Sequence, residues 1–329
     1  MRKIDKSKVR RILLITLSNI GDVILTTPVA DVLLREFPRA QLDVMVGPRG
    51  KDIFQYYKGV SELIVYDKKA GVFDKIKFFL RLRKAGYNIV VDLRNTILPF
   101  VLGARYRTSP LRHSSMLKMH KKDIHLSRLK SLGIDISNNN FYIPIEESDK
   151  KHAEELLDGL KEKPFIVVSP GAKSHVKRWP LKYFAELCDA LKEGLGYEIV
   201  IIGDESDRIV MERIMFYTKT KPVNLIEKTN IRELAYIIKK SRLLITNDSA
   251  PLHIGSACGA PVLAFFGPTD EKKYGPLTQG GSRVLRKDIR CSPCEVAQCV
   301  NKAKRYECLK SISVEEALKA AKELIALSS

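Results

Sequence analysis

A polar turn at residues 247–249 carries side chains that could bind or transfer a charged group. The apolar run before it, at 243–246, is typical of a buried strand. The segment after it, at 251–258, begins with proline and is followed by glycine, as helices often are. In a parallel sheet such a turn lies at the carboxyl ends of the strands, where ligands bind. The start of the helix offers unpaired N–H groups and a partial positive charge, which suit a diphosphate.

Three side chains of this segment are candidates for a binding site. Asp248, Ser249 and His253 would all face the end of the strand and the start of the helix. The alternative is an ordinary capped helix in a Rossmann-like layer, with His253 as a core histidine. Spacing alone leaves the two interpretations about even.

A second candidate loop follows the buried strand expected at 164–168. It reads Ser-Pro-Gly-Ala and then Lys-Ser-His-Val-Lys-Arg-Trp-Pro, over residues 169–180. The glycine permits a tight turn, and the loop carries cations toward a helix expected to begin near Pro180. Lys177 can neutralise the charge of a departing diphosphate. Trp179, the only tryptophan, is expected to pack in the core rather than take part in chemistry.

A third candidate is Asp22, which follows Gly21 between a strand expected at 10–17 and a helix expected at 23–37. A carboxylate at such a turn can act as a general base. The alternative is an aspartate that serves only the helix dipole. The turn lacks the G-x-G-x-x-G fingerprint, which disfavours a nicotinamide dehydrogenase.

The spacing of apolar and turn residues predicts the elements that position these candidates. Strands are expected at 10–17, 42–46, 61–66, 87–93, 164–168, 197–202, 223–225, 243–246 and 261–266. Helices are expected at 23–37, 73–85, 150–160, 208–217, 230–240, 251–258 and 313–327. After the strand at 197–202, Asp204, Glu205 and Asp207 are carboxylates suited to hold a ribose diol.

Four motifs together resemble a known family. They are S-N-I-G-D-V-I-L-T-T-P around Asp22, S-P-G-A with K-R-W-P around Lys177, the strand end near Gly203, and D-S-A-P-L-H-I-G-S-A-C-G-A-P-V-L-A-F-F-G-P-T from Asp248. Their order and spacing resemble the ADP-heptose:lipopolysaccharide heptosyltransferases, glycosyltransferase family 9. The resemblance implies that Asp22 is the general base and that Lys177 contacts the nucleotide phosphates. It implies that the donor is bound by Gly21, Ala172, Lys173, Glu205, Asp248, Ser249 and His253.

The resemblance also implies a fold and a reaction. The fold would be α/β of the GT-B type, with two Rossmann-like domains facing a cleft. Residues 1–160 would bind the acceptor and 161–329 the nucleotide sugar, and the last helix would return to the first domain. The reaction would be inverting transfer of heptose from ADP-heptose to the lipopolysaccharide inner core, with no cofactor or metal required. The alternatives are a family 9 transferase with another sugar or acceptor, and a non-catalytic protein that binds nucleotide sugars or anionic lipids.

Charge and hydropathy limit the partners and the location. The chain of 329 residues carries a formal net charge of +19, and residues 1–150 hold 28 Lys and Arg against 15 Asp and Glu. This excess indicates an anionic partner. Nucleic acid, an acidic lipid and a phosphorylated substrate would all fit this charge, and the absence of a recognised nucleic-acid-binding motif disfavours the first. The family resemblance implies an anionic glycolipid acceptor, lipid A with inner-core sugars, at the inner face of the inner membrane. No apolar run reaches the length of a membrane span, and a cytoplasmic, peripheral protein is expected. The basic helix expected at 73–85 presents either an ordinary solvent-exposed face or a patch that lies near lipid headgroups.

Four of the six cysteines are clustered. Cys291, Cys294, Cys299 and Cys308 have the spacing C-x2-C-x4-C-x8-C. In a cytoplasmic chain this pattern is compatible with a structural zinc, a reversible disulfide or free thiols. No catalytic role is expected for them.

Overall fold

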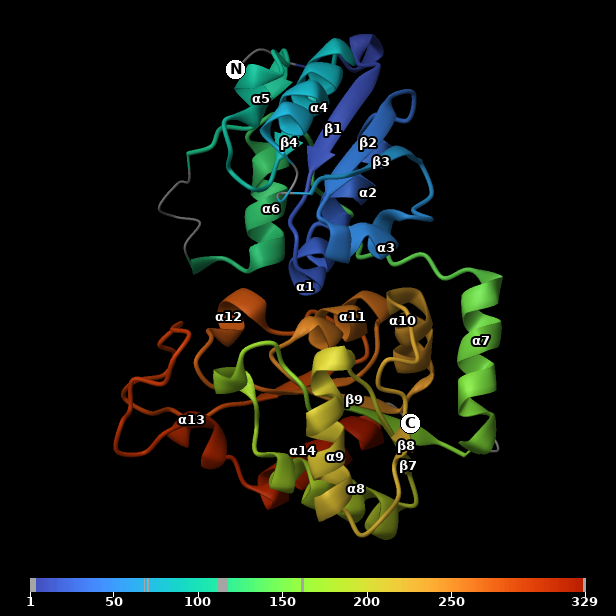
Figure 1. Cartoon of the computed structure of the whole chain (residues 1–329), viewed down its shortest axis with the longest axis vertical. Helices are drawn as coiled ribbons and strands as arrows, with labels where there is room; N and C mark the ends of the chain where they lie inside the picture. The colour runs from blue at the N-terminus through green and yellow to red at the C-terminus, as the bar shows by residue number, and fades with distance from the viewer. Residues whose placement is uncertain (1–3, 68, 70, 112–117, 161–162, 328–329) are drawn as a thin grey trace. The chain divides into compact units, whose positions relative to one another are not determined.

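The computed structural model describes residues 4–67, 69, 71–111, 118–160 and 163–327 (Figure 1). The chain forms two compact units, Met1–Pro144 and Ile145–Ser329. The boundary lies earlier than residue 160, where the sequence places it, because α7 (Glu147–Leu157) packs on α10 (Ile231–Lys240) of the second unit. The Arg232 guanidinium donates to the Asp149 carboxylate at 2.8 Å across this helix pair.

The first unit is built on a parallel sheet with the strand order β3-β2-β1-β4-β5. The strands are β1 (Arg11–Ile15), β2 (Gln41–Val46), β3 (Val60–Val65), β4 (Ile89–Asp92) and β5 (Tyr106–Arg107). The helices are α1 (Ile20–Ile24), α2 (Thr27–Glu36), α3 (Lys51–Phe54), α4 (Val72–Lys84), α5 (Leu98–Val101) and α6 (Lys121–Lys130). The central strand β1 is almost entirely apolar and buried, as a parallel sheet covered on both faces requires.

The helix expected at 23–37 is in fact two helices. Pro28 stands in the first turn of α2, where its missing N–H costs no hydrogen bond, and a continuous helix would have placed it in the interior. The Thr26 hydroxyl donates to the carbonyl of Val23 at 2.6 Å and closes the end of α1. The break leaves α1 as a short helix directly after the β1 turn.

The second unit has a parallel sheet of order β11-β10-β9-β6-β7-β8. Its strands are β6 (Phe165–Ser169), β7 (Glu198–Ile201), β8 (Val223–Asn224), β9 (Leu243–Asn247), β10 (Val262–Phe265) and β11 (Ser282–Leu285). Its further helices are α8 (Leu181–Leu195), α9 (Arg208–Tyr217), α11 (Ala250–Cys258), α12 (Glu271–Tyr274), α13 (Glu307–Lys310) and α14 (Val314–Leu327). Helix α11 ends at Gly259, whose φ of 72° is the left-handed stop that glycine adopts without strain.

The last helix, α14, belongs to the second unit. It packs on α8 and beside β9, β10 and β11, so the expectation that it returns to the first domain is wrong. Its inward residues, such as Ala317, Ala321 and Leu324, join the core of the second sheet, and burying this stripe there removes it from water. Ser313 and Glu316 form a capping box at its start, in which each backbone N–H donates to the side chain of the other residue.

Trp179 anchors the core of the second unit, as predicted. Its ring is fully buried and stacks on Phe265 of β10 with ring centroids 4.1 Å apart. Its indole N–H donates to the carbonyl of Ile312 at 3.1 Å, so the polar atom is satisfied. The end of the 170–179 loop is therefore fixed to the sheet. Across the part of the chain with described coordinates, no helix is both long and apolar enough to cross a membrane.

Candidate functional site

The site in the second unit is assembled by two neighbouring strands, β6 and β9. These strands are paired in parallel, with Ser169 opposite Thr246, so the turns that follow them leave the same edge of the sheet. Asn247 joins the two turns. Its side-chain amide donates to the carbonyl of Pro170 at 2.8 Å, and its amide oxygen accepts the backbone N–H of Trp179 at 2.9 Å. One buried side chain thus holds both ends of the 170–179 loop.

The loop places Lys177 beside Asp248. The Lys177 ammonium donates to Oδ2 of Asp248 at 2.7 Å, and the side chains of Lys177 and Asp248 are 29% and 5% exposed. The Thr269 hydroxyl, from the turn after β10, donates to the same oxygen at 2.6 Å. A lysine ammonium has three N–H donors, so its bond to Asp248 leaves donors for an anion. The lysine also lies 5.9 Å from the centroid of the Tyr274 ring.

Helix α11 begins beside this pair. Ser249 is its N-cap residue, in extended conformation, and its side chain forms no capping bond to the helix. The Ser249 hydroxyl instead lies 3.2 Å from that of Thr246. This hydroxyl therefore caps no N–H group of the first turn, in which Pro251 has no N–H and the N–H of Leu252 donates to the Ser249 carbonyl at 3.2 Å. His253 is buried within α11.

The Ser-Pro-Gly-Ala turn rests on Asp207. A Cβ added to Gly171 would lie 2.2 Å from a carboxylate oxygen of Asp207, so only glycine fits there. Burial, and then the charge of Asp204, raise the pKa of the Asp207 carboxyl. Ala172 is buried, and its carbonyl accepts a hydrogen bond from the Arg178 guanidinium at 2.8 Å. Lys173 is exposed.

Of the three carboxylates after β7, two support the local turn. Asp204 accepts the backbone N–H of Ser206 at 2.9 Å, and Asp207 accepts the backbone N–H of Asp204 at 3.3 Å. Glu205 is exposed at the start of the 3₁₀ turn that these bonds stabilise. It is therefore the carboxylate of the group best placed to meet a ligand.

Asp22 lies in the first unit, in the first turn of α1, and Gly21 precedes it. Its carboxylate accepts the side-chain amide of Asn19 at 3.0 Å. Both residues are partly exposed, so the carboxylate is held in place and still open to solvent. A fixed carboxylate that solvent can reach meets one requirement of a general base.

Comparison with known proteins identifies the family. A profile of glycosyltransferase family 9 (heptosyltransferase) matches residues 76–305. Lipopolysaccharide heptosyltransferase 3 of Escherichia coli K12 is 33% identical over 287 residues, which are 79% of this chain and 83% of that protein. The chain belongs to glycosyltransferase family 9.

Solved structures agree with this assignment. The family 9 glycosyltransferase of Veillonella parvula superposes with a TM-score of 0.80 at 27% identity, covering 96% of this chain and 97% of that one. The ADP-heptose lipopolysaccharide heptosyltransferase II of E. coli has a TM-score of 0.77 at 22% identity, covering 96% and 98%. The two Rossmann-like units of this glycosyltransferase are thus those of the GT-B class, as predicted.

Sequence reasoning missed three residues of the site in this family 9 enzyme. Asn247 was noted only as a turn residue, and Thr269 and Tyr274 were not assigned to the site. Thr269 stands directly after Gly-Pro at the end of β10, the neighbour of β9, and that position was the available signal. Nothing in the local sequence singles out Tyr274.

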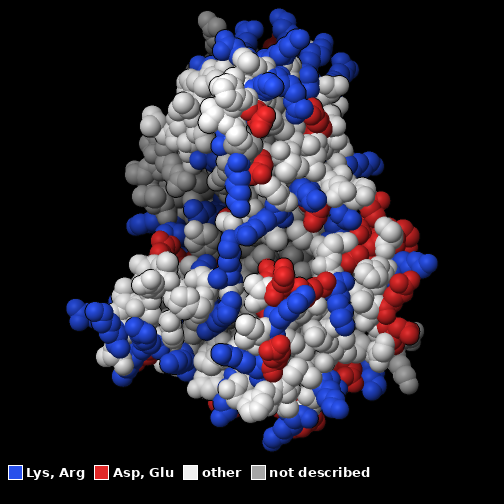
Figure 2. Space-filling view, in the orientation of Figure 1, with Lys and Arg blue, Asp and Glu red and all other residues white. Residues whose placement is uncertain are grey.

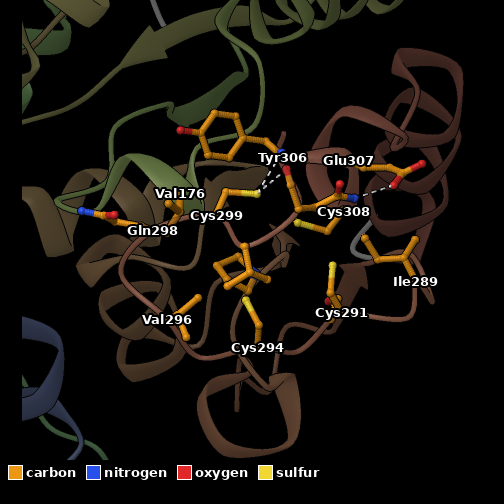
Figure 3. Close-up of a pocket in the computed structure, with 14 residues that line it drawn as sticks. Val176, Ile289, Cys291, Cys294, Val296, Gln298, Cys299, Tyr306, Glu307 and Cys308 are labelled. Carbon is orange, nitrogen blue, oxygen red and sulfur yellow. Dashed lines mark hydrogen bonds between the residues drawn. The ribbon is translucent and has the colours of Figure 1, made fainter. Parts of the chain in front are cut away.

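The four clustered cysteines line one pocket of this glycosyltransferase (Figure 3). They are free thiols, and in the described parts of the chain no group of three or more His, Cys, Asp or Glu residues is placed to hold a metal ion. Burial, and then the three other cysteines, raise the pKa of the Cys308 thiol. The segment supports the turn after β10, since the Ser292 hydroxyl donates to the Gly267 carbonyl at 2.6 Å.

Proposed function

We propose that this family 9 enzyme is an inverting heptosyltransferase, which moves heptose from ADP-heptose to a hydroxyl of the lipopolysaccharide inner core. The names of its relatives support the sugar and the acceptor, and the name of the E. coli heptosyltransferase II structure supports the donor. The observation that carries the proposal is the Lys177–Asp248 pair beside the start of α11. It combines a cation and helix N–H groups for a diphosphate with a fixed carboxylate for sugar hydroxyls.

The second unit is assigned to the donor. Lys177 and the first N–H groups of α11, at Ser249, stabilise the charge that develops on the departing ADP. Asp248 accepts hydrogen bonds from hydroxyl groups of the heptose, and His253 supports the turn from within the helix. Ala172 and Lys173 line the diphosphate loop, and Glu205 contacts the nucleoside. No metal is needed in this scheme, because a lysine and a helix dipole offset the charge of the diphosphate.

The first unit is assigned to the acceptor and the base. Asp22, with Gly21 permitting the close turn, takes the proton of the acceptor hydroxyl as its oxygen attacks the anomeric carbon. The bond from that carbon to the phosphate oxygen breaks on the opposite face, and its electron pair leaves with ADP. One displacement inverts the configuration of the sugar.

The proposed acceptor also sets the location. An inner-core glycolipid is anionic and membrane-bound, and the basic first half of the chain matches its charge. We therefore place the enzyme in the cytoplasm, peripheral at the inner face of the inner membrane, with no nucleic acid as partner. The four cysteines take no part in transfer, and a structural zinc among them is not part of the proposal.

The test combines nucleotide binding with transfer. Calorimetric titration without added metal should show ADP binding and much weaker UDP and NAD binding. Lys177→Met should weaken ADP binding by tenfold or more, since about 1.4 kcal/mol corresponds to that factor. The matched control is Lys182→Met, an exposed lysine on α8 whose replacement should leave ADP affinity unchanged.

Transfer is then measured with ADP-heptose and an inner-core acceptor, following the release of ADP. Turnover of ADP-heptose supports the proposal. Preference for UDP would keep the fold and family but discard heptose from ADP-heptose as the donor. ADP binding without turnover on any inner-core acceptor would favour a non-catalytic binding protein.

A further inference from the structure

Helix α4 has two apolar faces, and only one of them belongs to the core. On the inner face, Leu82 is buried, and Phe78 and Phe79 pack with it against the sheet of the first unit. On the outer face, Phe73, Ile76 and Leu80 are 82%, 51% and 61% exposed. Their spacing of three and four residues places them in one stripe along the helix. A helix with only water outside would carry polar residues at these positions.

Cations flank the outer stripe. At 100° per residue, Lys77 and Lys84 lie on one side of it and Arg83 on the other, and all three are exposed. The one carboxylate within the helix is Asp74, in its first turn, where it complements the dipole. In Figure 2, Lys and Arg side chains gather with uncharged surface at the end of the first unit where Figure 1 places α4.

Helix α5 also carries exposed apolar residues. Leu98 of α5 packs in the same core cluster as Phe78 and Phe79, so the two helices cover the same face of the sheet. Around that helix, Ile97 and Phe100 direct large apolar side chains to solvent. Exposed apolar residues scattered singly need no explanation, but an apolar stripe bordered by cations, such as that of α4, marks an interaction surface.

We propose that the outer face of α4, together with the exposed residues of α5, lies on the surface of an anionic lipid bilayer. Phe73, Ile76 and Leu80 would enter the boundary between headgroups and acyl chains. The long Lys77, Arg83 and Lys84 side chains would reach back to the anionic headgroups. A bilayer fits this face because it offers an apolar layer and a negative layer at fixed depth, in the same order as the side chains. One helix face of this size gives reversible binding, which suits a peripheral enzyme.

The inference rests on the proposed function only in explaining why the enzyme would bind a membrane, namely to reach a glycolipid acceptor. Binding is therefore measured without substrates. The full chain is sedimented with vesicles of phosphatidylethanolamine and phosphatidylglycerol, and separately with vesicles of phosphatidylcholine alone. Wild-type protein should sediment with the anionic vesicles and lose binding as salt is raised.

Two double variants separate the apolar and the charged contributions. Phe73→Ser with Leu80→Ser should weaken binding to anionic vesicles by about tenfold or more. Lys77→Glu with Lys84→Glu should weaken it by a similar factor at low salt, with a smaller effect at high salt. The matched control is Phe216→Ser on α9, an equally exposed phenylalanine of the second unit, which should bind as the wild type does.

Three results would overturn the inference. One is wild-type protein that does not sediment with anionic vesicles, and another is full binding by the Phe73, Leu80 variant. The third is a wild-type dimer in solution that the same variant dissociates, which would assign the face to a second copy. Transfer to a detergent-dispersed acceptor is measured in parallel and should be unchanged in the variants. Absence of wild-type transfer there would remove the proposed function but leave the vesicle result standing.

Discussion

Replacing Thr269 by valine tests whether the geometry of Asp248 sets the activity of the enzyme. The Thr269 hydroxyl donates to Oδ2 of Asp248 at 2.6 Å, and Lys177 donates to the same atom at 2.7 Å. Valine has nearly the same shape as threonine and lacks the hydroxyl. The substitution therefore removes one of two donors from a carboxylate that is almost completely buried, without opening a large cavity.

The expected magnitude follows from the charge and the burial. A hydrogen bond to a charged group contributes about 1.5–3 kcal/mol. Asp248 keeps its lysine partner in the variant, so the lower end applies, about 1.5 kcal/mol. That loss corresponds to about a tenfold decrease in kcat/KM if it falls on transition-state binding. The same loss in folding free energy would lower Tm of a unit of this size by about 3–6 °C.

The assay measures thermal unfolding together with kcat/KM for ADP-heptose. Thr269→Ser keeps the hydroxyl and should retain most of both values, which makes it the matched control. Wild-type Tm and wild-type kcat/KM in Thr269→Val would refute the reasoning. A lower Tm with unchanged kcat/KM would show that the bond stabilises the turn but does not orient Asp248 for the reaction.

Three further outcomes are expected. Asp22→Asn should abolish transfer while ADP binds as in the wild type, and unchanged turnover would exclude this carboxylate as the base. Gly171→Ala should lower the folding free energy by about 1–3 kcal/mol through overpacking. The control is Gly194→Ala, at an exposed helix position with open space, which should be neutral or stabilising. Equal effects of the two substitutions in urea unfolding would contradict the close contact at Gly171. The hydrogen bond to the glutamate of α10 raises the pKa of His152, so this contact stabilises the folded state fully below about pH 6.5 and is lost as pH rises through the raised pKa. The difference in urea midpoint between wild type and His152→Gln should therefore shrink with increasing pH, and a difference that grows would show that the sign is wrong.

Local signals in the sequence were sufficient for much of the fold. The apolar run, polar turn, proline and glycine between 243 and 259 predicted β9, α11 and its left-handed stop because each of these features acts over a few residues. The same holds for Trp179, whose size and position before a helix indicated packing. Lys177 and Asp248 were both expected in the donor pocket, but their direct contact was not expected.

The errors arose where distant contacts decide the outcome. The sequence of α7 is compatible with a linking helix between the domains. Only its ion pair and hydrogen bonds to α10, far along the chain, assign that helix to the second unit. The stripe of α14 shows that the helix must be buried but not against which sheet. The position of Thr269 after a strand end is visible in the sequence, but the pairing of β10 with β9, which brings it to the site, is not.

The double anchor at Asn247 affects how the proposed donor pocket can diversify. Both ends of the 170–179 loop are tied to one side chain, and the close contact of Gly171 with Asp207 fixes the first turn between them. An exposed position such as 173 can then exchange without moving Lys177. Single substitutions at exposed positions of the loop, unlike one at Gly171, would change the side chains that it presents to a ligand at little risk to the scaffold, whereas replacing Asn247 would alter the whole loop at once. The ends of the loop are thus fixed by Asn247, while its exposed side chains can vary.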